Sequence, residues 1–383
     1  MSKTNPNILF IYLSSEFGED EQLALEDIFE LNANDVSWKM VCIEGTEIHL
    51  RLEQFGKDHI ISLKKEPNEN FDRGFRELLS TQIRNGVNVV HVFGSNYLGS
   101  ILPWMMGYRQ VAVVVSEGPH VKKTIWHLIQ SFFYARIDTI IVPSIALKKR
   151  IQTMRPALAH KIRVVHAGLD FNIFNPEHFD FTVLRNQWGI DSNYYLVGMI
   201  ASPEYVKAQS AFIKAAASFL RNEELAQRTK FVIVGFKHEG NEELIALIRQ
   251  FHLQDQIILV PFEESIPKVL GTLDVYVLPS SKAMFGLQAI ESLAMGTPIL
   301  CAYGPDAGEW IGNSQGGLLI RSGDSFDMQR KLRAILEDPE ELKRMGKRAV
   351  LFAREHYDRN TRSHKLIQVF DRVLRKRQNI KTI

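Results

Sequence analysis

The sequence has few cysteines, no long apolar run and almost no excess of charge of either sign. Its two cysteines, Cys42 and Cys301, lie far apart in separate apolar segments. They are too few for a disulfide framework, and their setting predicts buried thiols in a reducing compartment. A formal net charge of +2 does not indicate a nucleic-acid-binding protein, because such proteins need a concentrated basic face.

No membrane-spanning segment and no signal peptide are expected. The longest apolar run near the middle of the chain, Val111–Val115, is far shorter than the roughly 20 residues that cross a bilayer. The N-terminus lacks the basic-then-apolar order of a secretory signal. We therefore predict a cytoplasmic protein, with peripheral contact at the inner face of the membrane as an alternative.

The length of the chain and its alternating strand and helix patterns are typical of a two-domain α/β protein. At 383 residues the chain is too long for one ordinary core, and 45% apolar residues with 23% charged residues are typical of a packed globular protein. Short β-branched runs alternate with helical patterns, which predicts parallel sheets built from βαβ units. Strands are expected in the first half at Ile8–Leu13, Trp38–Ile43, Val87–Phe93, Ala112–Val115, Thr139–Val142 and Ile162–Val165, with helices such as Glu21–Leu31 and Lys123–Tyr134 between them.

A polar segment, Asp170–Trp188, contains Pro176 and predicts a linker, after which the alternation restarts. Strands are expected there at Tyr195–Ile200, Lys230–Val234, Gln256–Val260, Val275–Leu278, Ile299–Cys301 and Gly317–Ile320. Helices are expected at Gln209–Leu220, Asn241–Phe251, Gly286–Ala294 and Ser325–Leu336. The simplest architecture has two doubly wound, Rossmann-like domains facing across a cleft, residues 1–176 and 177–355, with a final helical segment 356–383 crossing back to the first domain.

The C-terminal stretch Leu342–Leu374 has a helical amphipathic pattern and leads into a basic end. Its basic residues are Arg372, Arg375, Lys376 and Arg377. A solvated helix face is the favoured interpretation. Contact with anionic lipid headgroups is the sharper alternative, and the run Lys148, Lys149 and Arg150 carries the same two interpretations.

The stretch from Leu278 to Ala302 is the most informative part of the chain. It has the pattern of a strand, a loop, a helix entered at Phe285, Gly286 and Leu287, a Gly-Thr-Pro turn and a second strand. Gly286 permits a close approach of the backbone to a ligand, and the free N–H groups of the first helical turn can bind a diphosphate. Glu291 follows about one turn later, from where it could reach a ribose diol. The alternative is an ordinary βαβ unit with Glu291 in solvent.

This stretch resembles the donor-site motif of family 4 retaining glycosyltransferases, the group 1 glycosyltransferases of the GT-B fold. The resemblance extends in order and spacing to Val164–Pro176, Val197–Lys207, Phe231–Gly235, Leu273–Ser280 and Glu309. It implies a GT-B fold with an N-terminal acceptor domain and a C-terminal nucleotide domain. It also implies transfer of a sugar, such as a hexose, from a nucleotide-diphosphate sugar to a glycan or lipid-linked acceptor, in cell-surface polysaccharide or lipopolysaccharide synthesis, with no metal cofactor.

The resemblance also assigns roles to individual residues. It implies that Lys207 pairs with the donor diphosphate and that Glu291 accepts hydrogen bonds from the ribose hydroxyls. Phe285, Gly286 and Leu287 would present backbone groups to the phosphates and the sugar. The base pocket would be lined by residues that follow the strand ending at Val260, namely Pro261, Phe262 and Glu263. A solvated lysine at the start of a helix is the plainer interpretation of Lys207.

Four departures from the family pattern predict a divergent donor site. Ala283 stands where the family has a glutamate for the transferred sugar, and Ser202 stands where it has a phosphate arginine. Glu117 stands where it has a histidine, with His120 three residues later as a substitute or an exposed loop residue. The loop Ser14–Asp20 has three acids in place of paired glycines.

The departures leave two main hypotheses open. An active transferase is favoured, because the residues that would hold the nucleotide are kept. A non-catalytic GT-B protein that binds a nucleotide, a glycan or a partner subunit is the alternative, and an epimerase or phosphorylase on the same fold ranks third.

Overall fold

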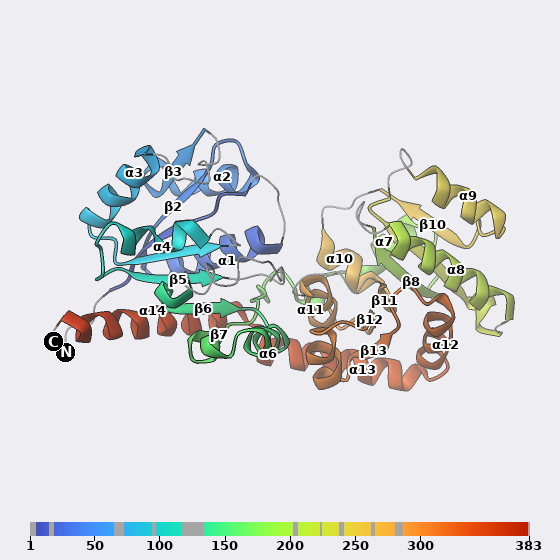
Figure 1. The fold of residues 1–383 in the computed structure, drawn as a ribbon. Coiled ribbons are helices and arrows are strands. Elements are labelled where there is room, and N and C mark those ends of the chain that lie inside the picture. The colour runs from blue at the N-terminus through green and yellow to red at the C-terminus, as the bar shows by residue number, and fades with distance from the viewer. Residues whose placement is uncertain are drawn as a thin grey trace. The chain divides into compact units, whose positions relative to one another are not determined.

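The computed structural model divides the chain into two compact units (Figure 1). It describes residues 5–14, 19–64, 73–93, 97–116, 134–201, 206–222, 224–236, 241–261, 265–279 and 286–381. Met1–Gly168 and Arg359–Ile383 form the first unit, and Leu169–Asp358 form the second. Among the described residues, no helix is both long enough and apolar enough to cross a membrane.

The first unit is a parallel seven-stranded sheet in the order β3-β2-β1-β4-β5-β6-β7. Its strands are β1 (Asn7–Ile11), β2 (Ser37–Ile43), β3 (Ile60–Leu63), β4 (Val89–Phe93), β5 (Ala112–Ser116), β6 (Thr139–Val142) and β7 (Ile162–Val164). Helices cover both faces, so the central strands are buried on both sides and read as continuous apolar runs. The order reverses between β1 and β4, which makes this a doubly wound sheet.

Two apolar cores lie on the two faces of this sheet. Its described helices are α1 (Glu19–Ala33), α2 (Glu47–Leu52), α3 (Arg73–Arg84), α4 (Tyr97–Met105), α6 (Ile145–Met154) and α14 (Arg359–Lys381). Helices α1, α2 and α14 pack on one face, whereas α3, α4 and α6 pack on the other. Strand residues alternate between the two cores: Ile140 and Val142 of β6 point to the α6 side and Ile141 to the α14 side. Short 3₁₀-helices span Glu53–Phe55, Lys57–His59 and Pro156–Lys161.

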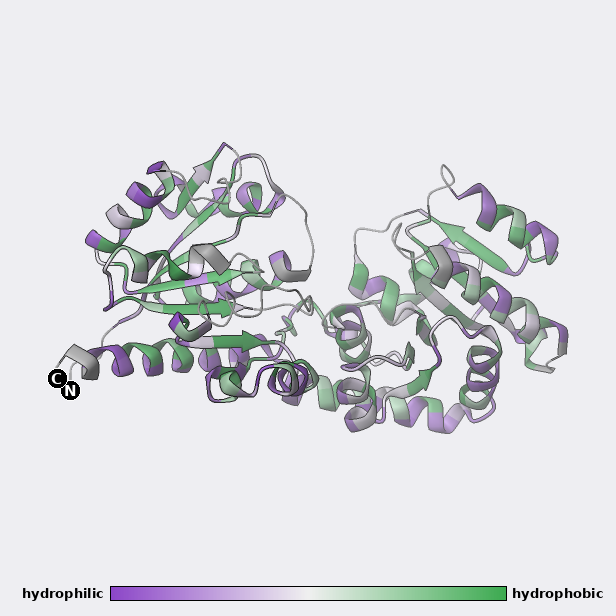
Figure 2. Ribbon diagram, viewed as in Figure 1, coloured by the Kyte–Doolittle hydropathy of each residue, from purple (hydrophilic) through white to green (hydrophobic). Residues whose placement is uncertain are grey.

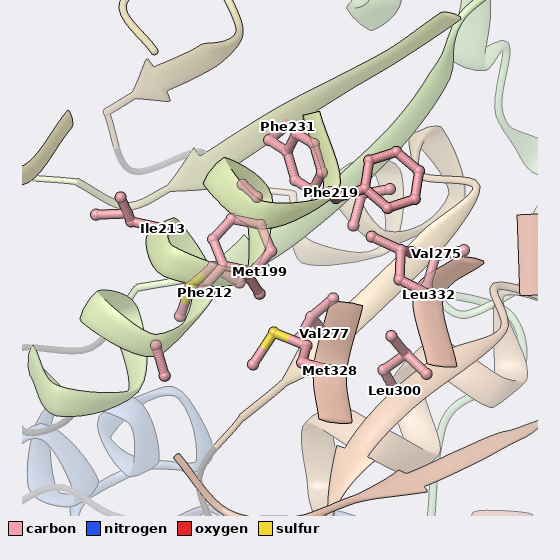
Figure 3. Packing of buried hydrophobic residues seen from close by; sticks show 14 of the residues in the cluster. Met199, Phe212, Ile213, Phe219, Phe231, Val275, Val277, Leu300, Met328 and Leu332 are labelled. Atoms are coloured by element: carbon pink, nitrogen blue, oxygen red, sulfur yellow. The ribbon is translucent and has the colours of Figure 1, made fainter. Parts of the chain in front are cut away.

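The second unit is a parallel six-stranded sheet in the order β10-β9-β8-β11-β12-β13. The strands are β8 (Tyr195–Ile200), β9 (Thr229–Val234), β10 (Ile257–Val260), β11 (Val275–Leu278), β12 (Ile299–Ala302) and β13 (Gly317–Ile320). The helices are α7 (Phe181–Gln187), α8 (Val206–Asn222), α9 (Glu242–Gln250), α10 (Ile266–Thr272), α11 (Leu287–Ala294), α12 (Ser325–Leu336) and α13 (Pro339–His356). Two 3₁₀-helices, Pro176–His178 and Glu224–Arg228, and a π-helix, Gly308–Gly312, complete the described elements of this unit. Phe212 and Phe219 of α8 meet Phe231 of β9 edge-on in its core (Figure 3).

The strands largely follow the prediction. Thr139–Val142, Tyr195–Ile200, Val275–Leu278 and Gly317–Ile320 have the predicted bounds, and all the other predicted strands are present within two residues at each end. Strand β3 was not predicted. The predicted helix Lys123–Tyr134 lies almost wholly outside the described residues. Cys42 and Cys301 are buried free thiols, as predicted.

The predicted linker Asp170–Trp188 is wrong, because this segment is packed into the second unit. Asp180 caps α7 by accepting a hydrogen bond from Thr182 N at 3.0 Å. Helix α7 packs on α10, and a Cβ atom built at Gly271 would overlap the ring of Phe181. Many polar residues of the segment, such as Asp170, Asn175 and Asp180, precede α7 and bond nearby residues of the segment.

The single helical stretch predicted over Leu342–Leu374 is also wrong, because it breaks after His356. Tyr357 O accepts a hydrogen bond from Leu169 N at 2.6 Å, and Leu169 forms an isolated parallel bridge with Asp358. Two non-helical residues, Tyr357 and Asp358, therefore separate α13 from α14 where the chain leaves the second unit. Helix α14 then packs in the first unit, beginning with Arg359 against Gly168.

Candidate functional site

The topology of the second unit brings the two candidate segments to one place. The strand order reverses between β8 and β11, which pair in parallel with Val275 opposite Val197. Ligands of doubly wound sheets bind beyond the carboxyl ends of the strands at such a reversal. The segment with Ser202 and Lys207 follows β8, and the segment with Ala283 to Leu287 follows β11. Strand order alone therefore brings the start of α8 and the start of α11 to the same end of the sheet.

Helix α11 is entered through a glycine that no other residue type replaces without strain. Gly286 is the N-cap and has a φ of 62°, in the left-handed region. A Cβ atom at this position would overlap the Trp310 ring, with Cη2 as the nearest atom. Trp310 is buried and lies on the π-helix Gly308–Gly312, a kind of element found often at functional sites. The indole ring thus supports the backbone from which the free N–H groups of α11 begin.

Glu291 is a buried acid with no partner in the described part of the chain. Only 7% of the residue is exposed, and no described residue forms a hydrogen bond or ion pair with its carboxyl group. Burial raises the pKa of Glu291 to about 7. A buried polar group without a partner costs free energy, so a ligand that donates hydrogen bonds here would relieve that cost. A solvated helix face, the alternative interpretation of Glu291, is excluded by its burial.

Tyr276 and Gln288 lie beside Glu291. The Tyr276 hydroxyl donates a hydrogen bond to Gln288 Oε1 at 3.0 Å, which links β11 to α11. Burial, followed by the charge of Glu291, raises the pKa of Tyr276. Tyr276 therefore stays neutral and holds Gln288, while the carboxyl group of Glu291, three residues further along α11, bonds to none of the residues that the structure describes.

The Gly-Thr-Pro turn fixes the other end of α11. Ser292 Oγ donates to Thr297 O at 2.8 Å, and Thr297 Oγ1 donates to Leu270 O at 2.7 Å. Gly296 has a φ of 73°. Side-chain hydrogen bonds thus hold the turn on α10, and the helix that carries Gly286 and Glu291 is fixed at both ends.

Three of the predicted site residues lie together and are fully described: Gly286, Leu287 and Glu291. Lys207 lies in the first turn of α8, where its backbone is described and its side chain is not. The remaining candidates, Glu117, His120, Ser202, Phe262, Glu263, Ala283 and Phe285, lie outside the described residues. Glu117 directly follows β5 of the first unit in the sequence.

Sequence reasoning missed Trp310 and the pair Tyr276 and Gln288. The available signal for Trp310 was a large aromatic residue between two glycines, Gly308 and Gly312, directly after Glu309. Burial followed by the charges of Glu309 and Asp306 raises the pKa of the buried Tyr357, so Glu309 lies near the end of α13.

No group of three or more His, Cys, Asp or Glu residues that could hold a metal ion occurs among the residues that the structure describes.

The second unit contains a segment that matches a known sequence family. Residues 180–352 match the family model described as "Glycosyl transferases group 1". A D-inositol 3-phosphate glycosyltransferase of Nocardia farcinica is 27% identical over 224 residues, which are 57% of this chain and 49% of that protein. The chain spans about half the length of the curated relatives it matches.

Solved structures extend the likeness to nearly the whole chain. A glycosyltransferase from Rickettsia africae aligns with a TM-score of 0.81 at 16% identity, over 97% of this chain and 99% of that one. The Anabaena protein HepE, solved in complex with UDP, aligns with a TM-score of 0.78 at 19% identity, over 94% of this chain and 98% of that one. At these identities the likeness concerns the fold, and it confirms the predicted GT-B architecture of two Rossmann-like units.

Proposed function

We propose that the protein transfers a sugar from a nucleoside-diphosphate sugar to a glycan or lipid-linked acceptor, and the match of residues 180–352 to the group 1 glycosyltransferase model supports this proposal. The observation that carries the proposal is the arrangement around α11. A helix N-terminus capped by Gly286 stands at the reversal of the strand order. The buried Glu291, which has no side-chain partner among the described residues, follows one turn later.

The nucleotide is proposed to bind along α11. The first-turn N–H groups after Gly286 would receive the diphosphate, because the helix N-terminus carries a partial positive charge. Glu291 would accept hydrogen bonds from the two ribose hydroxyls in its ionised form. Burial raises the pKa of Glu291 to about 7 and so disfavours the carboxylate, which two donated hydrogen bonds from the ribose would stabilise.

The transfer step is proposed to depend on stabilisation of the leaving diphosphate. Lys207, at the start of α8 beside β11, would supply a cation to the phosphates as the glycosidic bond breaks. We propose retention of configuration, with the acceptor hydroxyl attacking the face that the diphosphate leaves. This mechanism needs no second carboxylate at the sugar, so Ala283 does not by itself prevent it. A role in cell-surface polysaccharide or lipopolysaccharide synthesis is part of the proposal.

A nucleotide-binding protein without transferase activity is the second candidate. Ala283 and Ser202 favour it, because they replace the acid and the arginine expected around the sugar and the phosphates. Loss of one charge-assisted phosphate contact weakens binding by about 1.5–3 kcal/mol, or roughly one to two orders of magnitude.

Calorimetric titration followed by turnover assays separates these candidates. The full chain is titrated with UDP, GDP and ADP and then with their sugars, and release of the nucleoside diphosphate is measured with candidate acceptors. The transferase proposal expects binding of at least one diphosphate, about tenfold weaker in Glu291→Gln, together with turnover. Binding without turnover of any donor supports the second candidate, and no binding of any nucleotide overturns both.

A further inference from the structure

The basic residues of this chain are concentrated in two segments of the first unit. Residues 139–169 contain six Lys or Arg residues and no Asp or Glu, and residues 359–383 contain eight against one acid, Asp371. The rest of the chain has 32 basic and 43 acidic residues and is therefore acidic. The net charge of +2 hides this separation of charge.

The two segments fold along the same edge of the seven-stranded sheet. Strand β7 is the last strand in the order, and helices α6 and α14 flank it on opposite faces. Leu147 and Ile151 of α6 share a core with Ile162 of β7, whereas Leu366 and Phe370 of α14 share the other core with Val165. Figure 1 shows α6, β7 and α14 along one side of the first unit.

Helix α14 is held firmly in this position. Arg362 is buried and donates two hydrogen bonds to Asp27, at 2.6 and 3.0 Å, and one each to Val165 O and His166 O. Near the other end, Arg377 bonds Asp138 at 2.8 Å. These contacts orient the helix, and bands of polar and apolar residues alternate along it (Figure 2).

The exposed side of this edge carries several cations that have no partner in the described part of the chain. We call this surface the basic rim and define it by six exposed residues, Lys149, Arg150, Lys365, Arg372, Arg375 and Lys376. Lys365, Arg372 and Lys376 follow one another at spacings of seven and four, which places them on one stripe of α14. None of the six has an ion pair or hydrogen bond through its side chain with the residues that the structure describes.

The surroundings of the rim are basic as well. Burial and then the charge of Arg372 lower the pKa of Arg163 on β7. Burial lowers the pKa of Lys161, Asp138 opposes this effect, and the charges of Lys376, Arg377 and Arg136 add to it. Asp138 is already bonded to Arg377, so its charge is not available to neutralise the rim.

We propose that the basic rim docks the protein on a membrane surface that contains anionic lipids. Like charges that repel one another in the isolated protein gain free energy beside a layer of headgroup phosphates. Beside the rim lies Ile145, an aliphatic residue 45% exposed in the first turn of α6 and four positions before Lys149, which would enter the headgroup region. The exposed large apolar residues of the first unit include no aromatic ring on α6, β7 or α14, among the residues described, and so no platform for stacking nucleic-acid bases.

Vesicle sedimentation of the full chain tests the proposal. The protein is mixed with phosphatidylcholine vesicles with or without phosphatidylglycerol, and the bound fraction is measured at physiological salt and at about 1 M salt, where the Debye length is about 3 Å. Binding is expected only to the vesicles with phosphatidylglycerol and only at physiological salt. The triple variant Arg372→Gln, Arg375→Gln and Lys376→Gln should bind about 100-fold more weakly, since each cation near the surface contributes roughly a fivefold factor.

A charge-matched variant controls for net charge. Lys57→Gln, Arg76→Gln and Arg84→Gln remove three exposed cations from the first unit, one in the 3₁₀-helix Lys57–His59 before β3 and two in α3, whereas β3 and β7 are the opposite edge strands of the sheet. This variant should bind like the wild type, and the double variant Lys149→Gln and Arg150→Gln on α6 should lose about 20-fold. Circular dichroism verifies that each variant is folded.

Three results would overturn the proposal: equal binding to neutral and anionic vesicles, equal losses in the two triple variants, or complete displacement from vesicles by a short DNA duplex at the same phosphate concentration. Sedimentation needs no turnover, so this proposal and the transferase proposal fail separately.

Discussion

Gly286 shows how much depends on a single missing side chain. Its φ of 62° is unfavourable for other residues, and a Cβ atom would overlap Trp310. Gly286→Ala should lower the free energy of unfolding by about 2–4 kcal/mol, from backbone strain plus overpacking. Urea denaturation measures this change. Gly312→Ala is the control, because it has open space around the added methyl group and should change stability by less than about 1 kcal/mol.

Trp310 provides the complementary test of the same contact. If the ring causes the loss in Gly286→Ala, then Gly286→Ala with Trp310→Leu should be more stable than the sum of the single changes predicts. If the changes in the free energy of unfolding are strictly additive in this double-mutant cycle, the ring of Trp310 is not the cause of the loss in Gly286→Ala.

Glu291 should make the stability of the second unit depend on pH. Its folded pKa of about 7 exceeds its ordinary value of 4.5, so the folded state keeps a proton that the unfolded state has released between these values. The contribution is therefore fully present below pH 4.5 and falls as pH rises to 7, by on the order of 3 kcal/mol. Urea denaturation at pH 5 and pH 8 should show this slope in the wild type and a smaller one in Glu291→Gln. An identical slope in both proteins would rule the effect out.

At the candidate site, the sequence predicted the positions of those residues whose arrangement is encoded locally. The glycine before a helix and the acid one turn later are read from spacing along one segment, and both lie in the structure where that spacing puts them. Trp310 contacts Gly286 from 24 positions away, through the packing of the π-helix on α11, and no local pattern encodes that contact.

Among the elements, the last helix shows how a buried ion pair fixes a long segment. Arg362 and Asp27 are both almost fully buried, with side-chain exposures of 4% and 1%. Arg362→Met leaves the Asp27 carboxylate buried without its partner and should lower the free energy of unfolding of the first unit by about 3–5 kcal/mol.

The double variant Arg362→Met with Asp27→Leu should recover most of this loss, because no unpaired charge remains. Lys365→Met, at an exposed position on the same helix, should have little effect. Thermal unfolding of the three variants tests this, and a double variant as unstable as Arg362→Met would exclude the charge as the cause.

Two secondary-structure elements, β3 and α7, were not predicted from the sequence. Strand β3, Ile60–Leu63, is four residues long at the edge of its sheet, and none of its residues is fully buried, so its pattern is weak. Helix α7 is only seven residues long, and its Phe181 packs against Gly271 of α10. Both elements depend on tertiary contacts rather than on local periodicity.

For the whole molecule, the alternation of strands and helices predicted the fold because each βαβ unit is local. The two basic runs were identified separately in the sequence, but their juxtaposition was not predicted, because it arises only when residues 139–169 and 359–383 fold beside the same strand. A total charge near zero therefore says little about the surface of a protein whose two units differ in composition.

Ala283 and Ser202 are the two residues of the second unit that depart from the family pattern. The double variant Ala283→Glu with Ser202→Arg restores the acid and the arginine that this pattern has after β11 and β8, which are neighbouring strands at the reversal of the strand order. If the donor site is intact but weakened, the double variant should bind a nucleotide sugar about 10- to 100-fold more tightly, because one charge-assisted phosphate contact contributes about 1.5–3 kcal/mol. Calorimetry with the nucleoside diphosphate and with its sugar measures the two substitutions separately, since the arginine should affect both ligands and the glutamate only the sugar. Unchanged affinity for both ligands would mean that the loops after these strands serve a different ligand.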